Sequence, residues 1–120
     1  MPASTTLHEP ADKLTVETID MHRAIVSLIE ELEAVDWYTQ RADACKDAQL
    51  QAILKHNRDA EIEHATMTLE WIRRNFPKFD ETLKLYLFTK GDIAAIEETS
   101  TEGKENGPSL RLTVGGMKES

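Results

Sequence analysis

The short polar segment DACKDA, residues 43–48, decides the fold because it interrupts a pattern that is helical on both sides. Before it, apolar residues recur at steps of three and four, which predicts a helix from near Pro10 to about Asp43. After it, Asp47 can cap a second helix that continues to RRNFP, where Pro77 prevents continuation. A connection this short predicts that the two helices are antiparallel neighbours.

The remainder of the chain comprises a predicted short helix, a polar stretch and a final apolar segment. A shorter helix is expected over residues 78–88, ended by TKGD, with Asp92 capping one or two further turns through Ile96. We therefore expect an all-α domain over residues 1–96. Residues 97–120 begin with the polar stretch EETSTEGKENGPS, a predicted flexible linker, and end with apolar Leu110, Leu112 and Val114. This end is either a frayed terminus or a short peptide that docks into another protein's groove.

Composition limits the partners. The chain has 22 acidic and 14 basic residues, a formal charge of −8, which repels nucleic acid and anionic membrane and favours cations. No stripe of lysine and arginine is present, so no nucleic-acid partner is expected. The apolar runs are too short to span a bilayer, and the amino terminus does not resemble a secretory signal. With the single Cys45, these features predict a cytoplasmic protein in a reducing compartment.

Three ionisable residues occupy predicted helix seams. In AEIEHATM, residues 60–67, Glu61 and His64 share the seam of Leu54 and Trp71, although removing a charge from water costs several kcal/mol. Glu31 lies on a largely apolar face of the first helix. Measured from the middle of the turn, Glu31 is roughly 21 Å back and Glu61 roughly 24 Å forward, so these side chains can meet at one level. Two carboxylates and an imidazole suit iron, manganese or zinc.

The ligand set is half of a known arrangement. Di-iron carboxylate bundles take a Glu from each of two helices and a Glu-x-x-His from each of the other two, and this chain has one of each. A two-helix hairpin also cannot bury its own apolar stripe. Pairing two chains about a two-fold axis makes a four-helix bundle and joins two copies each of Glu31, Glu61 and His64. We predict a metal site only at this dimer interface.

The alternative at each position is structural. A Glu-x-x-His pair can be part of a solvated helix face, and Tyr38 can either approach the site or simply pack. Glu30 and Glu33 form a solvated acidic ridge or an ion-uptake site beside Trp37. At the level of function, the rivals are a non-enzymatic dimeric module closed by zinc or calcium, and a helical adaptor whose buried polar residues set the register.

Longer stretches are similar to a known family. HRAIVSLIEELEAVDWY, HNRDAEIEHATMTLEW and YLFTKGDIAAIE resemble the encapsulated ferritins, over about residues 8–97. LTVGGMK, from Leu112 to Lys118, resembles the peptides that dock cargo to the wall of an encapsulin shell. The resemblance implies a two-helix ferritin-like fold, a ferroxidase centre between two subunits, and dimers that assemble into an annular decamer inside an encapsulin nanocompartment.

The resemblance also implies roles for residues. The iron ligands would be Glu31, Glu61 and His64 of each chain, with Tyr38 close by; iron would be oxidised there and stored as mineral in the encapsulin lumen. Glu30, Glu33 and Trp37 match an outer acidic site regarded as a metal-uptake route, where calcium or zinc are further candidates. A third family position places a glutamate between His56 and Glu63, but this chain has Ala60 there.

Overall fold

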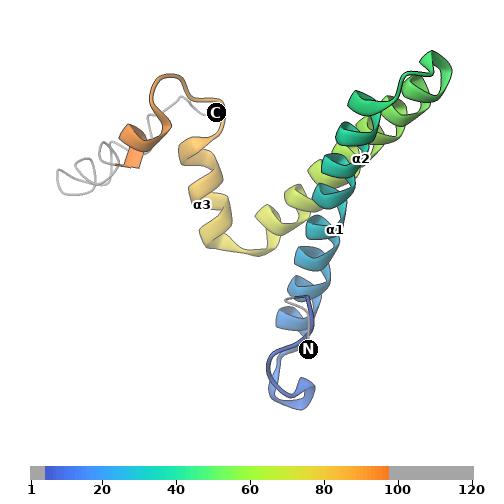
Figure 1. The fold of residues 1–120 in the computed structure, drawn as a ribbon. Helices are drawn as coiled ribbons and strands as arrows, with labels where there is room; N and C mark the ends of the chain where they lie inside the picture. The colour runs from blue at the N-terminus through green and yellow to red at the C-terminus, as the bar shows by residue number, and fades with distance from the viewer. Residues whose placement is uncertain (1–4, 98–120) are drawn as a thin grey trace. The chain divides into compact units, whose positions relative to one another are not determined.

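The computed structural model describes residues 5–97, and over this range the chain is all-helical. Its elements are a 3-10 turn η1, Ala11–Lys13, and the α-helices α1, Val16–Ala44, α2, Ala48–Asn75, and α3, Pro77–Tyr86 (Figure 1). Residues 93–97 are also helical. The predicted all-α class is confirmed, whereas most of the predicted linker and all of the docking peptide lie outside the described residues.

The chain forms two compact units, one ending at Asn75 and the other beginning at Phe76. In the first unit α2 runs back alongside α1 after a connection of residues 45–47, and the two helices pack along each other (Figure 1). None of the described helices is both long enough and apolar enough to cross a membrane.

The start of α1 differs from the prediction. The sequence favoured a start near Pro10, but only η1 forms there and Leu14 is extended, with φ −106° and ψ 144°. α1 begins at Val16 because Thr15 acts as its N-cap: the Thr15 side-chain oxygen accepts a hydrogen bond of 3.1 Å from the backbone N–H of Thr18. The missed signal is the Thr15 hydroxyl, which satisfies an N–H that a proline start would leave open.

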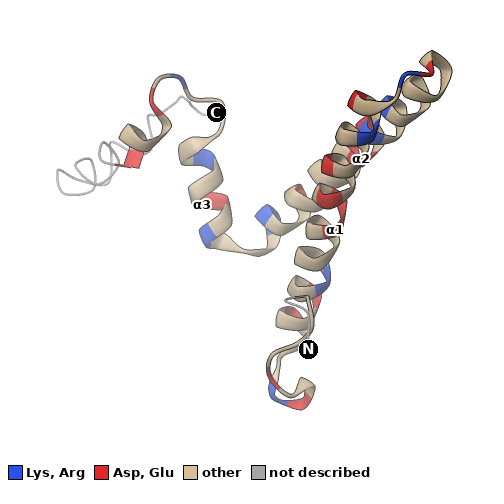
Figure 2. Cartoon of the chain, viewed as in Figure 1, with Lys and Arg blue, Asp and Glu red and all other residues tan. Residues whose placement is uncertain are grey.

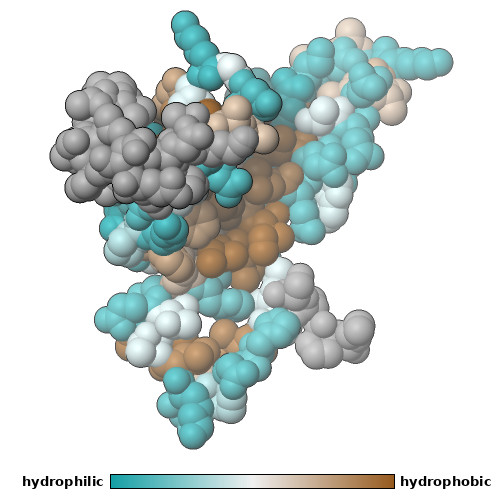
Figure 3. Space-filling model, turned by 90° about the vertical axis from the view of Figure 1, so that its left-hand side faces the viewer, coloured by the Kyte–Doolittle hydropathy of each residue, from teal (hydrophilic) through white to brown (hydrophobic). Residues whose placement is uncertain are grey.

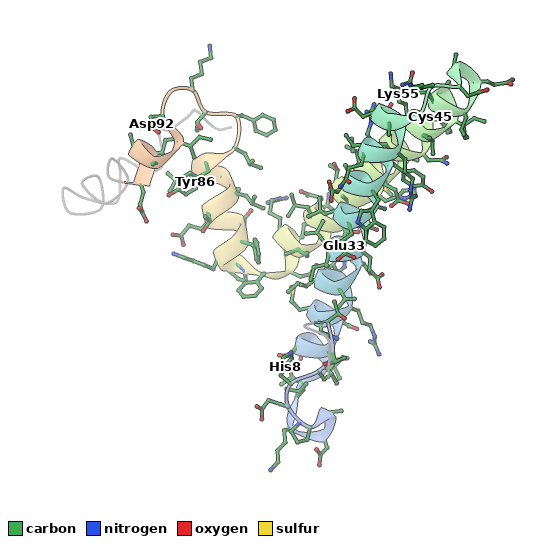
Figure 4. All side chains as sticks on the ribbon, viewed as in Figure 1. His8, Glu33, Cys45, Lys55, Tyr86 and Asp92 are labelled. Carbon is green, nitrogen blue, oxygen red and sulfur yellow. The ribbon has the colours of Figure 1, made fainter. Side chains whose placement is uncertain are left out.

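Side-chain hydrogen bonds stabilise the connection between α1 and α2. The Asp47 carboxylate accepts a hydrogen bond of 2.8 Å from the backbone N–H of Leu50, which caps α2. From the first turn of α2, Gln51 Nε2 donates to the carbonyl oxygens of Ala42, at 2.7 Å, and Cys45, at 3.3 Å. Since helix ends leave carbonyls without intrahelical partners, Gln51 ties the last turn of α1 to the start of α2. Cys45 is labelled at this end of the pair in Figure 4.

The core of the first unit is thin. Among the described residues only Ala42, Ala65 and Ile72 are buried. Packing one helix against one other helix covers a single strip of each, so apolar side chains outside that strip stay in contact with water. On the face drawn in Figure 3, hydrophobic side chains, in brown, lie exposed among hydrophilic ones. The half-exposed apolar residues of α1 and α2 include Ile25, Leu32, Leu50, Ile53, Ile62, Met67 and Trp71.

Charges of both signs follow the helices (Figure 2). The strongest cluster lies at the end of α2, where Glu70 accepts hydrogen bonds from Arg73, at 2.8 Å, and Arg74, at 2.7 Å. These hydrogen bonds, from Arg73 first and then Arg74, lower the pKa of Glu70 from 4.5 to about 2. The two arginines also lie where the helix dipole favours positive charge, so the cluster supports the C-terminal end of α2 predicted at RRN.

The second unit begins with α3. Pro77 occupies the start of α3, and the rings of Phe76 and Phe79 pack edge to face with centroids 5.4 Å apart. α3 ends at Tyr86, two residues before the predicted Phe88, because Leu87 is extended, with φ −73° and ψ 146°, and Phe88 after it adopts a left-handed φ of 62°. After Gly91, with φ 86°, Asp92 accepts a hydrogen bond from the backbone N–H of Ala94, as its predicted capping role requires.

The connection between α1 and α2 yields a stability prediction. Gln51→Ala removes the side chain that donates to Ala42 and Cys45, and we expect it to lower the free energy of unfolding by about 1 kcal/mol. Urea denaturation at one fixed protein concentration measures the change. Gln49→Ala, at an exposed position of the same helix turn, is the matched control. Equal stabilities for the two variants would show that Gln51 does not hold the connection.

Candidate metal site

The register between α1 and α2 follows from residues that contact each other across the pair. Gln51 of α2 hydrogen-bonds to the carbonyl of Ala42 of α1, and α2 runs back alongside α1. Glu31 lies eleven residues before Ala42, and the residue eleven positions after Gln51 is Ile62, the neighbour of Glu61. Because both helices rise by the same amount per residue, Glu31 and Glu61 lie at about the same height along the pair.

Glu61 and His64 lie close together on one side of α2. Glu61 Oε1 is 3.6 Å from His64 Nδ1, and the side chains are 28% and 49% exposed. This distance is too long for a hydrogen bond, and the two attract each other as an ion pair only when the imidazole is protonated. A carboxylate and an imidazole held this loosely can both turn toward a common cation.

Glu31 contains the feature of this region that most needs an explanation. Its Oε1 atom is buried, and within the described part of the chain no group donates a hydrogen bond to it. A buried carboxylate oxygen without a donor costs free energy, since its interaction with water is lost and nothing replaces it. A metal cation is one partner that would satisfy the oxygen, so the donor set of Glu31, Glu61 and His64 fits a metal such as iron.

One chain does not assemble a complete metal site. Over residues 5–97, no three side chains of His, Cys, Asp or Glu lie together in a way that could hold a metal ion. The structure thus brings Glu61 and His64 together and sets Glu31 at their level, without gathering the three into one cluster. Completion of the site by a second chain stays a prediction.

His64 stands in an uncovered apolar stripe. Ile53, Met67 and Trp71 lie eleven residues before, three after and seven after His64, spacings that place all of them on one side of α2. These apolar side chains are 52%, 59% and 40% exposed. A predicted metal ligand in the middle of such a stripe would lose its contact with water if another apolar surface covered this face.

The predicted outer acidic residues lie apart from this face. Glu30 and Glu33 are exposed, and Glu33 is labelled near the middle of α1 in Figure 4. Trp37 is 51% exposed and lines a shallow hollow of about 360 Å³ with Gln40 and Arg41. An exposed pair of carboxylates attracts cations without paying for burial, which suits a transient ion-binding surface.

The remaining candidate residues are Tyr38, which contacts Arg41, and the pair His56 and Glu63, which lacks a third ligand. Tyr38 is half-buried, and the guanidinium carbon of Arg41 lies 5.3 Å from the centre of its ring, a cation–π contact that sequence analysis missed although the i, i+3 spacing signals it. His56 and Glu63 are both exposed, and the intervening Ala60 offers no ligand atom. Nothing in the described residues adds a third donor to His56 and Glu63.

Sequence analysis also missed an open groove of about 400 Å³ between α1 and α2. It lies toward the end of the helix pair that is away from the connection. Its apolar lining comes from Met67 and Trp71 of α2 and the small Ala24 of α1. The groove is lined by Asp20, Arg23, Ala24, Ser27, Met67, Thr68 and Trp71.

The unsatisfied oxygen of Glu31 gives a prediction for the metal-free protein. Glu31→Leu replaces the half-buried carboxylate, with its buried Oε1 atom, by an apolar group of similar size, and we expect it to raise the free energy of unfolding by about 1 kcal/mol. Urea denaturation in the presence of a chelator tests this. Glu33→Leu, at an exposed position, should change little. Destabilisation by Glu31→Leu would mean that the carboxylate has a stabilising partner in the metal-free protein.

Comparison with known proteins gives a consistent picture. An encapsulated ferritin-like protein of Rhodospirillum rubrum is 59% identical over 105 residues, which cover 88% of this chain and 75% of that protein. A ferritin-like protein of Thermotoga maritima is 54% identical over 99 residues, covering 82% of this chain and 87% of that protein. The encapsulin nanocompartment cargo protein EncC of Myxococcus xanthus is 33% identical, with 98% of this chain and 99% of that protein covered.

Structural comparison agrees. The crystal structure of protein ne0167 from Nitrosomonas europaea is similar with a TM-score of 0.71 and 65% sequence identity, over 73% of this chain and 97% of that one. The family model named EncFtn-like matches residues 6–90, a range that includes α1, α2 and α3. The chain belongs to the EncFtn-like family.

Proposed function

We propose that this protein is a ferroxidase subunit, which oxidises Fe(II) at a site shared by two chains. The observation that carries the proposal is the buried Glu31 Oε1 atom, which has no hydrogen-bond donor in the described chain and lies at the level of Glu61 and His64. Each of two Fe(II) ions gives up one electron. Dioxygen takes both electrons and two protons to give hydrogen peroxide, or hydrogen peroxide takes them with two protons to give two waters.

The residues divide this work by their charge. Carboxylates favour the ferric over the ferrous ion because the higher positive charge gains more from each negative ligand. Glu31 and Glu61 of each chain supply that charge, and the neutral imidazole of His64 supplies a further donor without adding to it. Tyr38, half-buried on α1 and two helical turns after Glu31, packs beside this site in the proposal.

Pairing of two chains supports the same proposal. The side of α2 that carries His64 also carries half-exposed Ile53, Met67 and Trp71, and a two-fold pair buries all of them against an equivalent surface. Four helices then enclose two sets of Glu31, Glu61 and His64, the ligand inventory of a di-iron carboxylate bundle.

Higher assembly uses other surfaces in this proposal. Ile62 lies two residues before His64 and therefore faces another side of α2, and with Ile25 and Leu32 of α1 it leaves apolar surface that the two-fold pair does not use. We propose that such surfaces join dimers into an annular decamer. Glu30, Glu33 and Trp37 then serve as an outer site for incoming Fe(II), at which calcium or zinc can also bind.

The proposed location is the lumen of an encapsulin nanocompartment in the cytoplasm. Two relatives are named for encapsulation, the encapsulated ferritin-like protein of Rhodospirillum rubrum and the cargo protein EncC. The segment from Leu112 to Lys118 is the proposed contact with the shell protein. An open ring has no storage cavity, so the oxidised iron accumulates as mineral in the compartment around it.

Iron oxidation tests the first part of the proposal. Fe(II) is added aerobically to purified protein, and ferric absorbance is followed with the assembly state checked in the same samples. We expect Glu31→Ala to lower the initial rate over buffer by at least about 10-fold while the helices are retained, because the mutation removes two carboxylates from each shared site.

Asp59→Ala is the matched control, since Asp59 is an exposed carboxylate of α2 that lies two residues before Glu61. It should oxidise iron at the wild-type rate. Equal rates for wild type, Glu31→Ala and buffer would leave a metal-binding dimer closed by zinc or calcium, or a helical adaptor, as the better interpretation. A change of assembly by Glu31→Ala without any effect on iron would favour the adaptor.

Loading tests the second part. A chain that ends before Leu110 should oxidise iron as the full chain does and should fail to enter a co-expressed encapsulin shell, because the docking segment is removed and the iron ligands are not. Copurification of shells with each chain, followed by quantification of both proteins, measures loading. The docking assignment is wrong if the shortened chain still copurifies inside shells.

A further inference from the structure

The groove between α1 and α2 has the properties of a receptor for an apolar side chain. Its walls include the half-exposed Met67 and Trp71, and the paired Asp20 and Arg23, 2.7 Å apart, leave no net charge at its edge. The hydroxyl of Thr68 already donates to the carbonyl of His64 at 3.1 Å. An apolar occupant would therefore leave the Thr68 hydrogen bond intact and bring no uncompensated charge into contact with the groove.

The position of the groove along the helices identifies what can enter it. On α2 the lining residues 67–71 lie six to ten residues after Glu61, which is about 9–15 Å away from the connection end. On α1 the lining residues 20–27 lie four to eleven residues before Glu31, about 6–16 Å in the same direction. The groove is thus centred about 12 Å from the level shared by Glu31 and Glu61.

Ile53 lies at the corresponding distance on the other side. It is eight residues before Glu61, about 12 Å toward the connection, and it is 52% exposed. Eleven residues, three helical turns, separate it from His64, so the two side chains share one side of α2. A two-fold axis perpendicular to the helices, at the level of Glu31 and Glu61, carries the Ile53 of one chain to the height of the groove of the other.

We infer that a second copy of this chain inserts its Ile53 into the groove formed by Ala24, Met67 and Trp71. This inference rests on the proposed two-fold pair and names the contact that sets its register. The contact occurs twice, once on each side of the shared ligand level. A shift of one chain along the other would withdraw both isoleucines and move the two sets of Glu31, Glu61 and His64 to different levels.

Disulfide trapping tests the contact. In a Cys45→Ser background, Ile53→Cys and Thr68→Cys are combined in the full-length chain, which is then treated with a mild oxidant. Residues 53 and 68 of one chain are fifteen residues apart on α2, about 22 Å, so they cannot join within a chain. We expect most of the protein to run as a covalent dimer on non-reducing gels.

Two controls make the trap specific. Ile53→Cys combined with Thr66→Cys places the second thiol at an exposed position on another side of α2 and should give little covalent dimer. Either cysteine alone should also give little, which excludes links between two copies of residue 53 or of residue 68. Wild-type-like helical content of each reduced variant shows that it is folded.

The outcomes separate this inference from the proposed function. Strong trapping by residues 53 and 68 alone supports the contact, whether or not the wild type oxidises iron. Trapping no stronger than in the controls, in folded variants that still form dimers, overturns it. If the wild type nevertheless oxidises iron and Glu31→Ala does not, the ferroxidase proposal stands and the two chains pair in another register.

Discussion

A pair of helices has only one shared strip to bury, and this limit governs the rest of the first unit. α1 and α2 pack along each other, but among the described residues only Ala42, Ala65 and Ile72 are buried. Burial of apolar surface, worth about 25 cal/mol per Å², is the main favourable term in folding. A strip this narrow therefore contributes little free energy of stabilisation. The unit therefore has a strong thermodynamic reason to associate, and the apolar residues that it leaves exposed indicate where.

The same limit explains why ionisable residues can lie in the seam at all. In a closed core, Glu31 and Glu61 would lose most of their hydration and would need fixed donors to compensate for it. At the edge of an open pair, Glu61 and His64 keep 28% and 49% of their surface, and only one oxygen of Glu31 is cut off. In the proposed pair, the free-energy cost of burying this cluster would arise when two chains associate, and a cation bound there would compensate for it.

Local signals predicted the parts of the fold that depend on local chemistry. The capping role of Asp47 and the end of α2 at Asn75 follow from side chains within a few residues of each boundary. The start of α1 was missed because two competing signals, Pro10 and Thr15, lie five residues apart and the sequence alone does not rank them. The groove beside Trp71 could not be predicted, since its volume depends on how close α1 and α2 approach at Ala24.

The candidate site shows a different limit. The Glu-x-x-His spacing predicted that Glu61 and His64 would lie together, and helical rise predicted that Glu31 would lie at their level. The described residues of one chain hold no cluster of three, however, and a complete ligand set is predicted only for a pair of chains. A site shared in this way would form when two chains associate and would be lost when they separate. Binding of a cation to the pair, and not to the single chain, would favour the pair by mass action, so iron and assembly would each strengthen the other.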